Sequence, residues 1–227
     1  MRKIGKILMK FSFKKIDDNI FIYNNNKKFK LLKNKNFIVK DKKIAKIVIY
    51  ELNKFGIKNF VKLPVTSISM AISSLVEHDR KQLKKEVIKI LNFDSSLYRH
   101  HKNSALNKML EKNLNDSIDY FNLQFSTKLK KIYTSLGEQK NINTNNFSTY
   151  LQNLKLQNLY IFYRISKLNN SVVLTYNYFS NCYGITKLFN LGNIESKYQR
   201  SIWGSTMEQK KIDDEEKRIL KSFSIFF

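Results

Sequence analysis

The stretch FSFKKIDDNIFIYNNNKKFKLLKNKNFIV, residues 11–39, decides the fold class of this 227-residue chain. Its apolar residues come in short bursts, and polar segments rich in Asp, Asn and Lys separate them: Asp17–Asn19, Asn24–Asn26 and Lys33–Asn36. Short apolar runs between such turn segments are typical of consecutive antiparallel strands. The stretch therefore predicts a small antiparallel sheet.

The rest of the sequence has the apolar spacing of helices. One helix is expected from near Asp41 to Gly56, and another begins at Pro64, the only proline, because proline is favoured in the first turn of a helix. Further helical stripes follow at 68–76, 79–91, 104–135, 148–168, 172–178, 194–203 and 212–227. The acidic run 213–216 is expected near the positive N-terminal end of the last helix.

These patterns predict an α+β protein. We expect a small N-terminal β-rich α+β domain with one helix, residues 1–60, and a larger all-α domain, residues 61–227. Cys182, the single cysteine, excludes an intramolecular disulfide and is expected to be a small core residue. No apolar run reaches the roughly 18 residues that span a bilayer, so an integral membrane protein is not expected.

The charge of the chain suggests a second class of function. The net charge is +24, with 42 Lys and Arg against 18 Asp and Glu, and such an excess is typical of proteins that bind nucleic acid or an anionic membrane. Only six of the basic residues are arginine, the better reader of phosphates and base edges, and the lysines are spread along the whole chain. A lysine-rich nucleic-acid-binding protein is therefore the alternative hypothesis, and solvated helix faces explain the lysines more simply.

Residues that carry catalysis are scarce. The three histidines, His78, His100 and His101, lack the spacing of a metal site, and the six scattered glycines form no phosphate-binding loop. Asp94, Tyr98 and Arg99 lie within one helical turn or so and predict a structural hydrogen-bond cluster that fixes two helices. A hydrolase that uses Asp94 with His100 or His101 would need a nucleophile that the sequence does not supply. We expect no catalytic, cofactor-binding or metal-binding residues.

Segments along nearly the whole chain, taken in order, resemble the Atp12 family, the assembly chaperones of the F1 sector of ATP synthase. The matching segments are Phe11–Lys15, Glu51–Leu52, Pro64–Ile68, Asp94–Arg99, Asn170–Thr175 and Glu195–Gly204. The last of these contains Trp203, the only tryptophan. Leu52 stands where the family has a tryptophan, Met70 occupies a usual asparagine position, and residues 205–207 replace an acidic run, so that only Glu208 keeps a carboxylate at its end.

The resemblance implies a non-enzymatic chaperone that binds the unassembled α subunit of F1 and shields its interface until the β subunit replaces it. Such an interface is apolar and promotes aggregation when it is left uncovered. We predict Glu208, Gln199, Trp203 and Gly204 as partner-binding residues. Glu208 is expected to contact the partner directly, whereas the Trp203 ring is expected mainly to pack at a helix crossing.

The resemblance also implies where the protein acts and what it binds. We expect a monomer that binds the F1 α subunit and that takes no small-molecule substrate, cofactor or nucleic acid. The expected location is the cytoplasm of an alphaproteobacterium-like cell or, in a eukaryote, the mitochondrial matrix. Met1–Lys15 is basic and lacks acids, as a mitochondrial leader does, but it contains one serine and runs into the first predicted strand.

Overall fold

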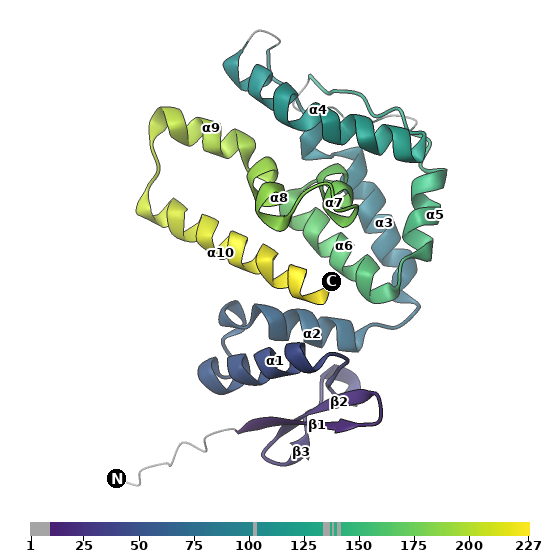
Figure 1. The fold of residues 1–227 in the computed structure, drawn as a ribbon, viewed down its shortest axis with the longest axis vertical. Coiled ribbons are helices and arrows are strands. Elements are labelled where there is room, and N and C mark those ends of the chain that lie inside the picture. Colours follow the sequence, from purple (N-terminus) through teal and green to yellow (C-terminus); the bar gives the residue numbers. More distant parts are fainter. Residues whose placement is uncertain (1–9, 102–103, 134–136, 138, 140–141) are drawn as a thin grey trace. The chain divides into compact units, whose positions relative to one another are not determined.

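The structure is a computed structural model that describes residues 10–101, 104–133, 137, 139 and 142–227 (Figure 1). The chain divides into two compact units, of which the first ends at Val76 and also contains Ile225–Phe227, and the second is Glu77–Ser224. The first unit holds a small sheet with two α-helices, and the second is helical. The predicted α+β fold class is confirmed, and the domain boundary near residue 60 stays a prediction. Most of the basic leader-like segment lies outside the described residues.

The sheet of the first unit is antiparallel throughout. Strand β1 (Phe11–Ile16) pairs with β2 (Asn19–Asn24), which also pairs with β3 (Lys27–Lys28) and β4 (Ile38–Val39). The register places Ile16 opposite Asn19, so the hairpin closes over two residues, of which Asp17 has a positive φ of 51°. The apolar burst at residues 29–32, between two of the polar segments, was expected to be a strand. It has only an isolated bridge from Lys30 to Asn36, and the short 3₁₀ helix η1 (Leu32–Asn34) follows.

Two helices complete the first unit, and local caps explain where each begins. Asp41 accepts hydrogen bonds from the N–H groups of Lys43 and Ile44 and caps α1 (Lys42–Phe55), which ends at Gly56 with φ of 70°. The 3₁₀ helix η2 (Phe60–Lys62) leads to α2 (Pro64–Ser74), which begins at Pro64 as predicted. The apolar faces bury a core that includes Ile22, Phe37, Ala45, Val48, Leu52 and Leu63.

The second unit is a helical domain built around one central helix. Its helices are α3 (Asp79–Asn92), η3 (Ser95–Leu97), α4 (Ala105–Phe125), α5 (Asn145–Asn153), α6 (Leu156–Asn169), α7 (Val172–Phe179), α8 (Ile185–Gly192), α9 (Ile194–Trp203) and α10 (Met207–Phe223), and η4 (Ser224–Phe226) follows. Helix α7 contacts α3, α4, α6 and α8 and lies in the middle of this unit in Figure 1. Its residues from Val172 to Asn177 are all buried, as expected for a helix that is covered on every side.

Several sequence expectations for the second unit are corrected by the structure. The stripe at 104–135, which the spacing left as one helix or two, contains the single helix α4. It ends at Phe125, Ser126 follows with φ of 52°, and the next apolar residues, Leu129 and Ile132, are buried beyond the helix. Helix α8 is not predicted by the sequence analysis. The acids 213–216 lie in the middle of α10, because Thr206 caps that helix earlier.

Two findings concern the cysteine and the membrane. Cys182 is exposed, which contradicts its expected place in the core. Helix α7 ends at Phe179, and Asn181 with φ of 59° turns the chain before Cys182. Among the described residues, no helix has both the length and the apolar character to cross a membrane.

Candidate partner-binding site

Helices α9 and α10 form a hairpin whose sharp turn depends on one glycine. Helix α9 ends at Trp203, and Gly204 follows with φ of 80° and ψ of 178°. L-residues with a side chain rarely adopt this conformation. Thr206 then begins α10, because its side chain accepts a hydrogen bond of 3.1 Å from the N–H of Gln209. The local sequence Gly-Ser-Thr thus ends one helix and starts the next.

An ion pair ties the two helices together behind the turn. The Arg200 guanidinium of α9 bonds to Asp213 Oδ2 of α10, and each side chain is 22% exposed. Gln209 Nε2 donates to the other oxygen, Asp213 Oδ1, at 3.3 Å. The carboxylate is therefore shared between both helices, which fixes the geometry of the hairpin. This pair was not predicted from the sequence, because Asp213 was expected near the N-terminal end of the last helix and Arg200 had no expected role.

Large apolar side chains lie exposed at the tip of the hairpin. Trp203 is 78% exposed, Met207 71% and Ile202 55%. The expectation that the Trp203 ring packs at a helix crossing is therefore wrong. Trp203 is the last residue of α9, directly before the turn. A Cβ atom at the neighbouring Gly204 would meet no heavy atom within 4 Å, so no other element packs against the turn at Gly204. We call Ile202, Trp203 and Met207 the apolar tip.

A shallow polar hollow lies beside the apolar tip. It has a volume of about 320 Å³, and its lining residues are Ser196, Gln199, Arg200, Trp203, Gly204, Ser205, Thr206 and Gln209. Three of the four predicted partner-binding residues, Gln199, Trp203 and Gly204, are thus brought together at one place. Glu208 does not line the hollow. It lies exposed in the first turn of α10, next to Met207, where the positive end of the helix favours a carboxylate.

The base of α9 is connected to the segment that follows η3. Glu195, in the first turn of α9, lies with its Oε1 atom 3.1 Å from His100 Nε2, and Gln199 Nε2 approaches the same oxygen at 3.4 Å. His100 therefore has a partner other than Asp94. The hydrolase hypothesis needs His100 or His101 to reach Asp94, and Asp94 is wholly buried with donors around both of its oxygens.

The predicted cluster of Asp94, Tyr98 and Arg99 exists as three separate attachments. Asp94 Oδ2 accepts from the N–H groups of Val172 and Val173 at the start of α7. The Tyr98 hydroxyl donates to the carbonyl of Gly137 at 2.6 Å. Residues 95–97 form a 3₁₀ turn rather than an α-helix, so the expected contact between residues four apart does not form.

Arg99 also differs from its expected role. It is 4% exposed and donates to the carbonyls of Ser96 and Tyr98 and to Asn115 Oδ1. Burial lowers the pKa of its guanidinium from the ordinary value, and the charges of Glu111 and Tyr133 oppose that change. The three side chains thus connect η3 to the start of α7, to Gly137 and to Asn115 on α4, and the structural role of the cluster stays a prediction.

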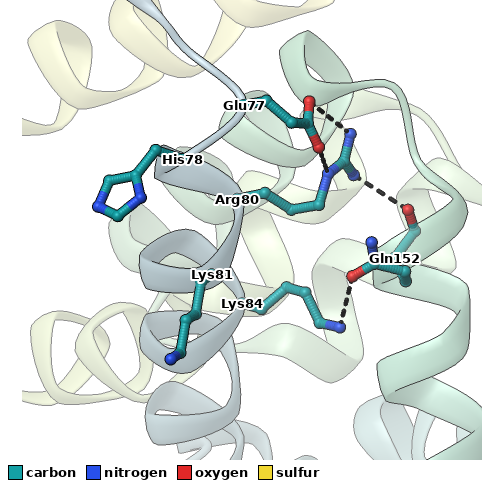
Figure 2. Close-up of a pocket in the computed structure, with 6 residues that line it drawn as sticks. All are labelled: Glu77, His78, Arg80, Lys81, Lys84 and Gln152. Atoms are coloured by element: carbon teal, nitrogen blue, oxygen red, sulfur yellow. Dashed lines mark hydrogen bonds and ion pairs between the residues drawn. The ribbon is translucent and has the colours of Figure 1, made fainter.

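A second hollow lies at the start of α3 (Figure 2). It has a volume of about 310 Å³, and it is lined by Glu77, His78, Arg80, Lys81, Lys84 and Gln152. Figure 2 shows Arg80 between Glu77 and Gln152, while His78 and Lys81 point away from it. Arg80 pairs with Glu77 and donates to the carbonyls of Gln152 and Leu154 at the end of α5. This arginine caps a helix, so the hollow is the side of a structural attachment.

Among the described residues, no group of three or more His, Cys, Asp or Glu side chains is arranged to hold a metal ion.

The hairpin carries exposed aromatic and aliphatic side chains beside polar and charged ones. This combination is characteristic of protein-binding surfaces, in which an aromatic anchor is surrounded by a polar rim. The fold and the site together describe a helical domain, joined to a small sheet unit, that presents an exposed hairpin.

Comparison with solved structures shows which fold this is. A chaperone candidate from Agrobacterium tumefaciens matches with a TM-score of 0.80 over 96% of this chain and 84% of that chain, at 12% identity. Atp12 from Paracoccus denitrificans matches with a TM-score of 0.78 over 96% of this chain and 94% of that chain, at 13% identity, and so does a mutant of that protein. The chain has an Atp12-like fold. No family model and no curated protein matches it by sequence.

Proposed function

We propose that this protein is an assembly chaperone for the F1 sector of ATP synthase, which binds the unassembled α subunit and shields its interface until the β subunit replaces it. The observation that carries the proposal is an Atp12-like fold over 96% of the chain, with the predicted partner-binding residues at an exposed hairpin. The protein has no catalytic step in this proposal.

The apolar tip supplies the physical basis for binding. Burying a large apolar side chain that is now exposed contributes about 1.5–3 kcal/mol, and the apolar tip offers three such side chains close together. An unassembled subunit presents apolar surface that aggregates unless it is covered. A small aromatic anchor would bind that surface in competition with water, and a larger matching interface from the β subunit would displace it.

The charges around the apolar tip would set the orientation of the partner. Glu208 is exposed beside Met207, and the Arg200–Asp213 pair lies one to two turns behind it. Exposed charges at the rim of an interface act more on the association rate and on selectivity than on total affinity. We therefore assign anchoring to Trp203 and steering to Glu208, while Gln199 and Gly204 shape the hollow that Trp203 lines.

The proposal includes a setting for this activity. The protein would act as a monomer in the cytoplasm of a bacterium or in the mitochondrial matrix, wherever F1 is assembled. It requires no cofactor and no nucleic acid.

Co-purification followed by mass spectrometry tests the proposal. Tagged protein expressed in its own cell type is expected to retain the F1 α subunit, and added β subunit is expected to release it. A Leu123→Ser variant, changed at a residue that is 81% exposed on α4, serves as the matched control and should retain the α subunit equally. Recovery of nucleic acid without any F1 subunit would contradict the proposal.

A further inference from the structure

The first unit presents aromatic and aliphatic side chains among lysines, far in sequence from the hairpin. Tyr50 on α1 is 58% exposed, and Phe60 and Val61 in η2 are 58% and 61% exposed. Lys54 and Lys62 flank them and are exposed as well. We call Tyr50, Lys54, Phe60, Val61 and Lys62 the lysine–aromatic patch.

Contacts between the side chains show that this patch is continuous. Lys54 Nζ lies 2.6 Å from the Tyr50 hydroxyl and 5.3 Å from the centre of the Phe55 ring. Lys62 Nζ lies 5.8 Å from the centre of the same Phe55 ring. Since Phe60 and Val61 directly precede Lys62 in one 3₁₀ turn, the end of α1 and η2 form one surface.

Hydrogen bonds hold the turn that carries Phe60 and the chain that follows it. The turn is closed by hydrogen bonds from Lys62 N–H to Asn59 and from Leu63 N–H to Phe60. Leu63 is fully buried, and the chain beyond it is fixed because Glu51 accepts hydrogen bonds from the N–H and hydroxyl of Thr66 at 2.8 and 2.7 Å. The turn is therefore held in shape with its apolar side chains outward.

The exposed charges of the segment that carries the patch, residues 42–76, are all positive. From Lys42 to Val76 the only acidic residue is Glu51, which is buried and bonded to the start of α2. The exposed lysines of this segment are Lys42, Lys43, Lys46, Lys54, Lys58 and Lys62. Charge complementarity therefore favours an anionic partner for this surface.

We propose that the lysine–aromatic patch binds peripherally to anionic lipid bilayers. Apolar side chains that project from a rigid turn can enter the boundary between headgroups and acyl chains, and lysines around them contribute attraction to anionic headgroups. Their aliphatic stems allow the ammonium groups to stay in the headgroup layer. This inference goes beyond the proposed chaperone function and uses a different surface.

Nucleic acid is the less favoured anionic partner for two reasons. Val61 is aliphatic and has no ring that stacks on a base, and residues 10–76 contain no arginine. The patch is also separate from the two hollows described above: no residue of it is among the described residues that line the hollow at the start of α3 (Figure 2) or the hollow beside the apolar tip. An exposed apolar turn with lysines and no arginine fits a lipid surface better than a strand of nucleic acid.

Co-sedimentation of the full chain with vesicles tests this proposal. The protein is expected to sediment with vesicles of equimolar phosphatidylcholine and phosphatidylglycerol and to stay largely in solution with pure phosphatidylcholine. The double variant Phe60→Ser/Val61→Ser is expected to lower the partition coefficient on the order of tenfold or more, because two apolar side chains no longer enter the bilayer. Net charge is unchanged by these substitutions, so the loss reports apolar insertion alone.

Matched variants separate the patch from the overall positive charge. Leu123→Ser/Leu168→Ser removes two exposed apolar side chains from the second unit and should leave the partition unchanged. Lys54→Gln/Lys62→Gln is expected to weaken binding by about thirtyfold. Lys85→Gln/Lys89→Gln, on the exposed side of α3, changes the net charge equally and should have a much smaller effect.

Two results would overturn the proposal. One is equal loss of vesicle binding from both lysine pairs together with no loss from Phe60→Ser/Val61→Ser, which would indicate attraction by net charge only. The other is binding of single-stranded RNA that falls in Phe60→Ser/Val61→Ser while vesicle binding does not. Far-ultraviolet circular dichroism checks that each variant keeps its fold.

Discussion

The backbone N–H of Val172 donates a 2.7 Å hydrogen bond to Asp94 Oδ2, across 78 positions of sequence. The N–H of Val173 donates to the same oxygen at 2.9 Å, and Ser96 donates to Oδ1 from its N–H and its hydroxyl. One buried carboxylate therefore caps the 3₁₀ turn η3 and the central helix α7 together. Because α7 contacts four other helices, this residue fixes the centre of the helical unit.

Removal of this carboxylate is expected to destabilise the protein strongly. Asp94→Ala leaves several buried N–H groups without an acceptor, and we expect a loss of about 3 kcal/mol in the free energy of unfolding. Asp94→Asn keeps one acceptor oxygen and should lose less. Asp116→Ala, at an exposed position on α4, is the control and should change stability by less than about 0.5 kcal/mol. Urea unfolding monitored by circular dichroism measures all three, and equal stability of Asp94→Ala and wild type would contradict this role.

The same residue predicts a dependence of stability on pH. Burial raises the pKa of the Asp94 carboxyl from its ordinary value of 3.8, although hydrogen bonds from Ser171, Val173 and Ser96 oppose the rise. The folded state therefore binds the Asp94 proton more tightly than the unfolded state. The stability that results from this tighter proton binding is present at low pH and is lost as pH rises through the folded-state pKa. The stability difference between wild type and Asp94→Asn should grow as pH falls from neutrality. A difference that shrinks over that range would show that the hydrogen bonds outweigh burial.

The apolar tip predicts a separation of binding from stability. Trp203 is 78% exposed, so Trp203→Ala should change the free energy of unfolding by less than about 0.5 kcal/mol. If the ring anchors the F1 α subunit, its loss should weaken retention by about thirtyfold or more. Affinity measured with purified α subunit, beside urea unfolding of the same variant, tests both parts. Strong destabilisation by Trp203→Ala would instead indicate that the ring packs within the fold.

Glu208 gives a test of steering by charge. Glu208→Lys reverses an exposed charge beside the apolar tip, and it also places a cation at the positive end of α10, which should cost about 0.3–1 kcal/mol of stability. We expect slower association with the α subunit and a weaker dependence of that rate on salt. Asp116→Lys carries the same charge change on α4 and should leave association unaltered. Unchanged kinetics in Glu208→Lys would remove this residue from the proposed site.

Gly204 predicts a backbone effect without any change in side-chain packing. A Cβ at this position meets nothing within 4 Å, but φ of 80° with ψ of 178° is strained for any residue with a side chain. Gly204→Ala is therefore expected to cost about 1–3 kcal/mol, chiefly by reshaping the hairpin. Gly184→Ala is the control for backbone strain, since Gly184 is equally open and has an ordinary φ of −81°; because Gly184 is the N-cap of α8, where alanine is disfavoured, we expect a smaller loss than in Gly204→Ala. Thermal unfolding of both variants compares them.

Much of the fold could be predicted from the sequence because its signals are local. Asp41 lies next to the N–H groups that it caps, Gly56 ends the same helix, and Pro64 begins the next, so each boundary depends on residues a few positions away. The hairpin at Asp17 and the α+β class were predictable for the same reason. The order of short motifs also indicated the Atp12-like fold, which the structural comparison bears out at only 12–13% identity.

The grouping of part of the candidate site was predictable, but its arrangement was not. Gln199, Trp203 and Gly204 are close in sequence, so their grouping followed from one motif. The pairing of Arg200 with Asp213 depends on where α10 begins, and the capping residue Thr206 sets that point earlier than the acidic run suggests. Ile202 and Met207 were not predicted as site residues, because a local sequence pattern does not show whether an apolar side chain is exposed.

The sequence by itself determined the α+β class, the boundaries at Asp41, Gly56 and Pro64, the lysine-rich composition and the motifs that resemble an assembly chaperone. Only the tertiary structure decided that Trp203 and Cys182 are exposed, that Asp94 binds the start of α7, and that Phe60 projects from a rigid turn. The physical reason is that hydrogen bonds within a turn or helix involve near neighbours, whereas burial depends on which distant segment packs against a given side chain.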